Sequence, residues 1–134
     1  MTSKVVYQGK LRTEAIHLKS GNIIITDAPT DNHGKGEAFS PTDLAATSLA
    51  SCILTIMGIA ADKRDIDISG ASAEVKKVMA ANPRRIAQIV INISMPTQDY
   101  TESEKKLLEK AAHNCPVGLS LAEETEEVIT INWS

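Results

Sequence analysis

The residues of this sequence with the clearest capacity for chemistry are its two cysteines, Cys52 and Cys115. A thiolate is a good nucleophile, and two thiols that meet in a fold can cycle between a reduced pair and a disulfide. Two cysteines in a chain of 134 residues do not make a disulfide scaffold, so lasting oxidation of this pair would be a catalytic event. We therefore expect a small thiol redox protein whose thiols are reduced at rest.

Each cysteine also has a purely structural interpretation. Cys52 lies within an apolar run, where a free cysteine usually packs into a core, and a reactive thiolate there would need an outside cation to stabilise it. Cys115 directly precedes Pro116, so it either caps a helix that begins at the proline or forms a tight corner between two helices. From the residues alone, both interpretations stay open at each position.

Other kinds of site have little support. A structural zinc site takes four ligands at short local spacing, whereas the cysteines and His17, His33 and His113 show no paired spacing. The sequence contains no Gly-x-Ser-x-Gly elbow, phosphate loop or dinucleotide fingerprint. The net charge is −3, and no basic stripe interleaved with aromatic residues is visible. We expect no metal, no cofactor and no nucleic-acid partner.

The elements that must position the thiols can be predicted from hydrophobic periodicity within one domain, residues 1–134. Residues 4–18 predict a strand pair with a bend at Gly9, residues 22–26 a short buried strand, and residues 27–39 a long loop. Ser40-Pro41-Thr42-Asp43 is a good helix start, with Asp43 at the acidic position of a capping box. The uncharged run over 44–61 is rich in Ala, Ser and Thr, so it predicts a helix buried on all sides rather than a membrane span.

The second half of the chain alternates between strands and helices. Residues 66–79 and 85–95 predict two long strands, and Thr101 to Glu104 form a capping box that begins a helix. The apolar face of that helix is expected to carry Cys115, and a short second helix to run from Pro116 to about Glu123. Residues 128–133 predict a closing strand. This order indicates an α+β fold with antiparallel sheets, and the absence of an apolar leader favours a cytoplasmic protein without a membrane partner.

The pattern around the cysteines extends this argument. Residues 40–52, SPTDLAATSLASC, strongly resemble the first-cysteine helix of the OsmC/Ohr family, the osmotically inducible protein C and organic hydroperoxide resistance proteins. Residues 114–117, NCPV, are similar to the second-cysteine motif of the family. Residues 11–14, LRTE, followed by Ser20-Gly21, resemble its N-terminal region, so that the functional arginine falls on Arg12. The resemblance covers nearly the whole chain. It implies an OsmC-like fold, with antiparallel sheets wrapped around a long buried central helix, in an intertwined homodimer with active sites at the subunit interface.

The resemblance also implies roles for these residues. Cys52 would reduce an organic hydroperoxide and become a sulfenic acid, with Arg12 as its cation. Cys115 would then form a Cys52–Cys115 disulfide, and an external thiol reductant would reset the pair. The expected function is a hydroperoxide reductase in oxidative stress defence. Two alternatives are a non-catalytic dimer that binds a small apolar or sulfur-containing ligand, and a thiol enzyme with thioester or persulfide chemistry.

The sequence departs from the family at one functional position. Peroxidase members place a glutamate where this chain has Thr42, and the nearest acid is Asp43. Asp43 either orients Arg12 or only caps the helix, and Glu37 on the preceding loop is a second substitute.

Overall fold

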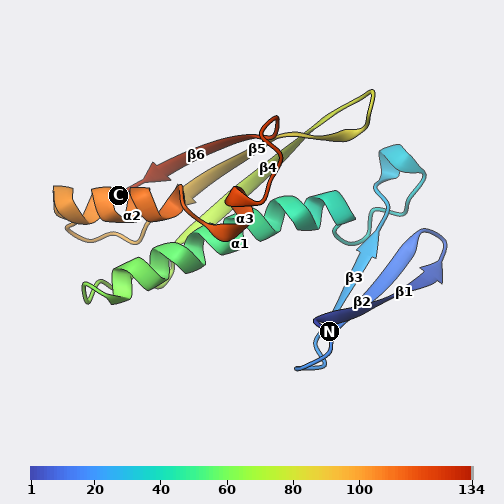
Figure 1. Cartoon of the computed structure of the whole chain (residues 1–134), viewed down its shortest axis with the longest axis horizontal. Coiled ribbons are helices and arrows are strands. Elements are labelled where there is room, and N and C mark those ends of the chain that lie inside the picture. Colours follow the sequence, from blue (N-terminus) through green and yellow to red (C-terminus); the bar gives the residue numbers. More distant parts are fainter. Residues whose placement is uncertain (134) are drawn as a thin grey trace. The chain divides into compact units, whose positions relative to one another are not determined.

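The structure is a computed structural model that describes residues 1–133 and divides into two compact units, Met1–Ala45 and the residues from Ala46 onward. It is an α+β structure with two three-stranded sheets and one long helix (Figure 1). The element order follows the predicted one of strands, helix, strands, helices and strand. The single domain expected for residues 1–134 stays a prediction.

The first unit holds a sheet of three antiparallel strands, β1 (Ser3–Gly9), β2 (Arg12–His17) and β3 (Ile23–Asp27). The register of β1 and β2 shifts between Tyr7 and Gly9, and Gly9 has a φ of +85°, which glycine adopts without a steric penalty. The predicted strand pair with a bend at Gly9 is therefore confirmed. After β3 the chain continues in a loop that contains a short 3-10 turn, η1 (Thr30–Asn32).

The prediction that the third strand is buried was wrong for most of its length. Ile23, Ile24 and Ile25 are 56%, 46% and 43% exposed. Successive side chains of a strand point to opposite faces of the sheet, so these three isoleucines occupy both faces. The chain thus leaves apolar side chains exposed on both faces of this sheet.

The long helix α1 (Pro41–Asp62) begins and ends close to the predicted residues. Among residues 1–133 it is the one helix that is long and apolar enough to cross a membrane, although its buried side chains form part of the protein core. The expectation of a helix buried on all sides was wrong, because Ser51, Thr55 and Ile59 are exposed. Its buried residues are Ala46, Leu49, Ala50, Ile53, Met57 and Ala61. Their spacing follows one helical face.

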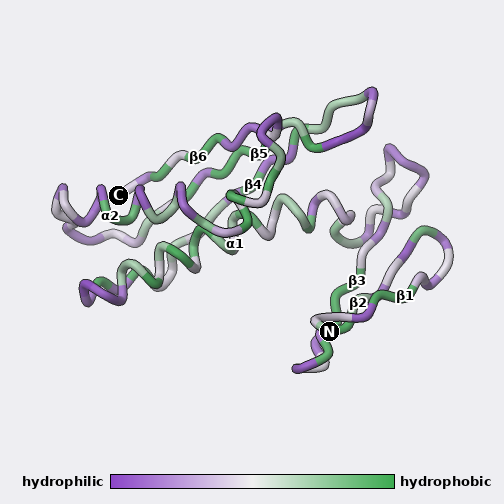
Figure 2. Tube along the Cα trace, in the orientation of Figure 1, coloured by the Kyte–Doolittle hydropathy of each residue, from purple (hydrophilic) through white to green (hydrophobic). Residues whose placement is uncertain are grey.

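The sheet of the second unit contains β4 (Ser72–Ala80), β5 (Arg85–Ser94) and β6 (Glu126–Asn132), in that order. Ile89, Ile91 and Ile93 are 0% exposed, which confirms the predicted inward face of β5, and Figure 2 shows hydrophobic residues along this strand. The first predicted strand of this pair starts later than expected, at Ser72, because residues 66–71 are irregular, with a turn at Ser69-Gly70.

The expected all-antiparallel arrangement was wrong at one edge of this sheet. β4 is antiparallel to β5, but β6 is parallel to it. Two helices lie between β5 and β6 in the sequence, α2 (Glu102–Ala112) and α3 (Pro116–Leu119). A crossover of this length lets the chain return to the same end of the sheet and run in the same direction.

Both helices of this crossover begin where the sequence predicts but end earlier. The capping box of α2 is present, with Thr101 Oγ1 accepting a hydrogen bond from the Glu104 N–H. However, α2 ends at Ala112, and α3 is shorter than predicted. Cys115 is therefore not on the apolar face of α2 but in the corner between the helices. Leu108 and Ala112 of α2 join the buried face of α1 and the isoleucines of β5 in one hydrophobic core.

Candidate active site

Cys115 is held at the start of α3 by both sequence and packing. It is the N-cap residue of that helix, Pro116 follows at the first helical position, and the Gly118 N–H donates a hydrogen bond to Cys115 Sγ over 3.3 Å. Its side chain is 1% exposed and belongs to the core. Both interpretations that the sequence left open hold, because Cys115 lies in the corner between α2 and α3 and also caps α3.

The thiol of Cys52 is the neighbour of the Cys115 thiol. Cys52 lies on α1 and packs, half-buried, against the same core, and its side chain interacts with that of Cys115 closely enough to raise the pKa of Cys115. Both cysteines are free thiols. The structure thus brings together two of the four predicted site residues, from helices that are far apart in the sequence.

The surroundings of Cys115 favour its protonated form. Burial raises the pKa of this thiol most strongly, and the hydrogen bond with Cys52 and the negative charge of Glu127 raise it further. The hydrogen bond from the Gly118 N–H acts in the opposite direction and lowers the pKa. The net result is a raised pKa, so Cys115 is a thiol at neutral pH and must lose its proton before it can act as a nucleophile.

Arg12 is positioned within the first unit by an acid that the sequence analysis did not single out. Arg12 Nε donates to Asp27 Oδ1 over 2.7 Å and Arg12 Nη2 donates to Asp27 Oδ2 over 2.8 Å. The β2–β3 register makes this contact possible because it places Arg12 directly opposite Asp27. The Asp27 side chain is 1% exposed and also accepts a hydrogen bond of 3.2 Å from the Glu37 N–H.

The interaction between Arg12 and Asp27 changes both pKa values so that both side chains stay charged. The hydrogen bonds from Arg12 hold the pKa of Asp27 below its usual value, and the same bonds raise the pKa of Arg12. The carboxylate of Glu37 is a more distant partner, 4.0 Å from Arg12 Nη2. A two-point contact of this kind fixes the plane of the guanidinium as well as its position.

Asp43 lies in the capping box that the sequence predicted. The Ser40 N–H donates to Asp43 Oδ2 over 3.1 Å, and the Asp43 N–H donates to Ser40 Oγ over 3.0 Å. The hydroxyl groups of Ser40 and Thr42 are 3.2 Å apart. These contacts account for the structural role of Asp43 at the start of α1, while a direct role in chemistry stays a prediction.

Two acidic residues that the sequence analysis did not single out contact or face the predicted site residues, Asp27 in the first unit and Glu127 in the second. Asp27 ends an otherwise apolar strand, a position at which a carboxylate needs a partner, and that signal could have identified it. Glu127 is one of a run of acids before the last strand, and nothing in the sequence distinguishes it from its neighbours. Within residues 1–133, no group of three or more His, Cys, Asp or Glu side chains is placed to hold a metal ion.

The comparisons with known proteins identify the family of the chain. Residues 34–130 match the family model of the OsmC-like proteins, while no curated protein matches the chain. A Psychrobacter arcticus 273-4 protein, provisionally described as an osmotic stress induced and detoxification response protein, is 55% identical, with a TM-score of 0.94 over 98% of this chain and 96% of its own.

More distant solved structures share the fold. An organic hydroperoxide resistance protein OsmC from Legionella pneumophila is 16% identical, with a TM-score of 0.76 over 98% of this chain and 97% of its own. An organic hydroperoxide resistance protein from Elizabethkingia anophelis is 15% identical, with a TM-score of 0.76 over 100% of this chain and 97% of its own. With a family model that matches most of its length, this chain belongs to the OsmC-like family.

Proposed function

We propose that this protein reduces organic hydroperoxides with its two thiols and defends the cytoplasm against oxidative stress. The observation that carries the proposal is the pair of free thiols, Cys52 and Cys115, which pack in one core where Cys52 acts directly on the pKa of Cys115. Two thiols that interact directly are candidates to close to a disulfide. The names of the Legionella and Elizabethkingia neighbours point to the same substrate class.

In the proposed reaction the Cys52 thiolate attacks one oxygen of the hydroperoxide. The O–O bond breaks, the other oxygen leaves and takes a proton as an alcohol, and Cys52 is oxidised to a sulfenic acid. The sulfur of Cys115 then attacks the sulfenic sulfur, so that a disulfide forms and water leaves. An external thiol reductant takes up the two oxidising equivalents by disulfide exchange.

The remaining site residues assist the first step in this proposal. Arg12 supplies the cation that stabilises the Cys52 thiolate, and Asp27 orients its guanidinium in place of the family's glutamate. In this proposal Asp43 also assists the first step from the start of α1, in addition to its capping contact with Ser40. We further propose that the active protein is a homodimer, as the resemblance to the family implies.

The test treats the reduced protein with one equivalent of cumene hydroperoxide and follows intact mass and free thiols. The wild type is expected to lose both thiols and a mass of about two hydrogens, which is the signature of a disulfide. Cys115→Ser is expected to stop at a sulfenic acid that dimedone can trap, and Cys52→Ser to lose peroxide turnover. Survival of both thiols in the wild type would overturn the peroxidase and favour the ligand-binding alternative.

A further inference from the structure

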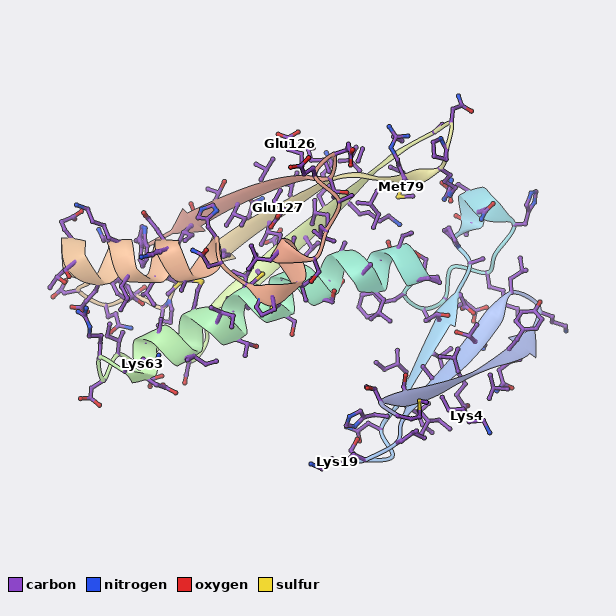
Figure 3. All side chains as sticks on the ribbon, viewed as in Figure 1. Lys4, Lys19, Lys63, Met79, Glu126 and Glu127 are labelled. Atoms are coloured by element: carbon purple, nitrogen blue, oxygen red, sulfur yellow. The ribbon has the colours of Figure 1, made fainter. Side chains whose placement is uncertain are left out.

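The start of β6 brings an acidic side chain to Cys115. The β5–β6 register pairs Glu127 with Ile89, whose side chain lies fully inside the core, so Glu127 belongs to the inner face of the sheet. Glu126, its neighbour in sequence, belongs to the opposite face, where it accepts a hydrogen bond of 3.1 Å from Gln88 Nε2. Figure 3 labels both residues at the start of β6.

Gly118 of α3 leaves open the space between the two groups. A Cβ at this glycine would lie 2.8 Å from Glu127 Oε1 and 3.3 Å from Cys115 Sγ. The carboxylate and the sulfur thus converge on one point that any side chain other than hydrogen would fill. Gly118 does not have a positive φ, so its backbone conformation does not require a glycine at this position.

Cys115 needs a group of this kind, since its burial keeps the proton on the sulfur. A thiol is a far weaker nucleophile than a thiolate, so the step in which Cys115 attacks Cys52 requires that this proton leave. The Gly118 N–H can stabilise a thiolate but cannot accept a proton, because it is a donor. Glu127 provides an acceptor, and its side chain is exposed, so a proton can pass from it to solvent.

We propose that Glu127 is the proton acceptor for Cys115 when the disulfide closes, an inference that rests on the proposed pairing of Cys52 with Cys115. The Cys115 proton passes to the Glu127 carboxylate as the sulfur–sulfur bond forms and the sulfur–oxygen bond of the sulfenic acid breaks. The departing hydroxide takes a proton from solvent and leaves as water, and Glu127 returns its proton to solvent. Cys115 is oxidised, the sulfenic acid is reduced, and Glu127 ends unchanged.

The test isolates disulfide closure from peroxide chemistry by using dithiobis(nitrobenzoic acid). The exposed part of Cys52 takes up one thionitrobenzoate as a mixed disulfide and releases the other, and Cys115 then attacks the Cys52 sulfur and releases the second. Absorbance separates the two phases. Glu127→Gln is expected to slow the second phase about tenfold or more, at the lower end of general base effects, and to leave the first unchanged.

Two further variants test whether the effect comes from the Glu127 carboxylate and its approach to the Cys115 sulfur. Glu126→Gln removes the neighbouring charge from the opposite face and is expected to leave both phases unchanged. Gly118→Ala keeps both groups but places a methyl between them, so it is expected to slow only the second phase. Thermal unfolding of each variant is measured as the control that its fold is retained.

The contrary outcomes are distinct. If Glu127 acted only as a negative charge, Glu127→Gln would favour the Cys115 thiolate and speed the second phase, which would overturn the inference, as would an unchanged rate. If the wild type released no second thionitrobenzoate, the pairing of the cysteines would fail, and the proposed function would fall with it.

Discussion

Two hydrogen bonds hold the Arg12 guanidinium against the Asp27 carboxylate, at one end of adjacent strands. Asp27 is buried, and the hydrogen bonds from Arg12 lower its pKa and so keep it ionised. A carboxylate whose pKa is lowered on folding stabilises the folded state wherever the unfolded chain would bind the proton more tightly. Protonation of Asp27 at low pH is therefore expected to lower the stability of the folded protein.

The first prediction concerns this pH dependence. The contribution of Asp27 to stability is present above about pH 4, the ordinary range of the carboxyl group, and is lost as the pH falls through the lowered pKa. Asp27→Asn is expected to lower the midpoint of thermal unfolding at pH 7, by an amount that shrinks progressively toward pH 3. Glu14→Gln on the neighbouring strand β2 serves as a control, and an equal deficit for Asp27→Asn at all pH values would contradict the prediction.

The candidate site was predictable from the sequence to the extent that its residues sit in local patterns. Cys115 before Pro116 and Asp43 after Ser40 are such patterns, because a cap and its partners lie within one turn of a helix. The contact of Arg12 with Asp27 and the approach of Cys115 and Glu127 to Gly118 join different elements. They depend on strand register and helix packing, which a single sequence does not specify.

At the scale of elements, the start of α1 rests on reciprocal hydrogen bonds between Ser40 and Asp43. Loss of a capping side chain typically costs about 0.5–2 kcal/mol, so we expect Ser40→Ala and Asp43→Ala each to destabilise the protein by that amount in urea unfolding. The alkylation rate of Cys52 by iodoacetamide distinguishes the two roles of Asp43. A rate that falls in Asp43→Ala but not in Ser40→Ala would show that the carboxylate also acts on the thiol.

The strand β5 contributes fully buried isoleucines to the core of the second unit. Ile91 has no exposed surface and lies in register with Val75 of β4 and Ile129 of β6, which both pack against the same core. Ile91→Ala is expected to destabilise the protein by about 2–5 kcal/mol through lost burial and a cavity, measured by urea unfolding. Val90→Ala, one residue away and on the other face, should cost clearly less. Equal costs would mean that the two faces of this sheet are equally packed.

The same strand shows why some elements were predicted better than others. Alternating isoleucines in β5 and the capping box of α2 are local signals, and the strand and the start of the helix were both placed correctly. The direction of β6 and the exposure of β3 are not local properties. Strand direction follows from how the crossover returns, and the burial of an apolar strand follows from what packs on it.

At the scale of the whole molecule, the first unit exposes more apolar surface than a small sheet normally leaves in water. Val5, Tyr7 and Ile24 share one face of this sheet by register, and each is at least 46% exposed. Ile23 and Ile25 expose the other face. Three-stranded sheets need an apolar face packed against another layer, and large exposed apolar patches mark interaction sites.

A second copy of the chain would cover this surface, as expected for the proposed homodimer. We therefore expect sedimentation equilibrium to give twice the chain mass of 14.4 kDa. Ile24→Glu would bury a charge in the interface and shift the mass toward one chain, because an unpaired buried charge is strongly unfavourable. Lys19→Glu, which changes the charge in the turn between β2 and β3, is the control and should leave the mass unchanged. A wild type with the mass of one chain at all concentrations would contradict the dimer, and the exposed isoleucines would then need another partner.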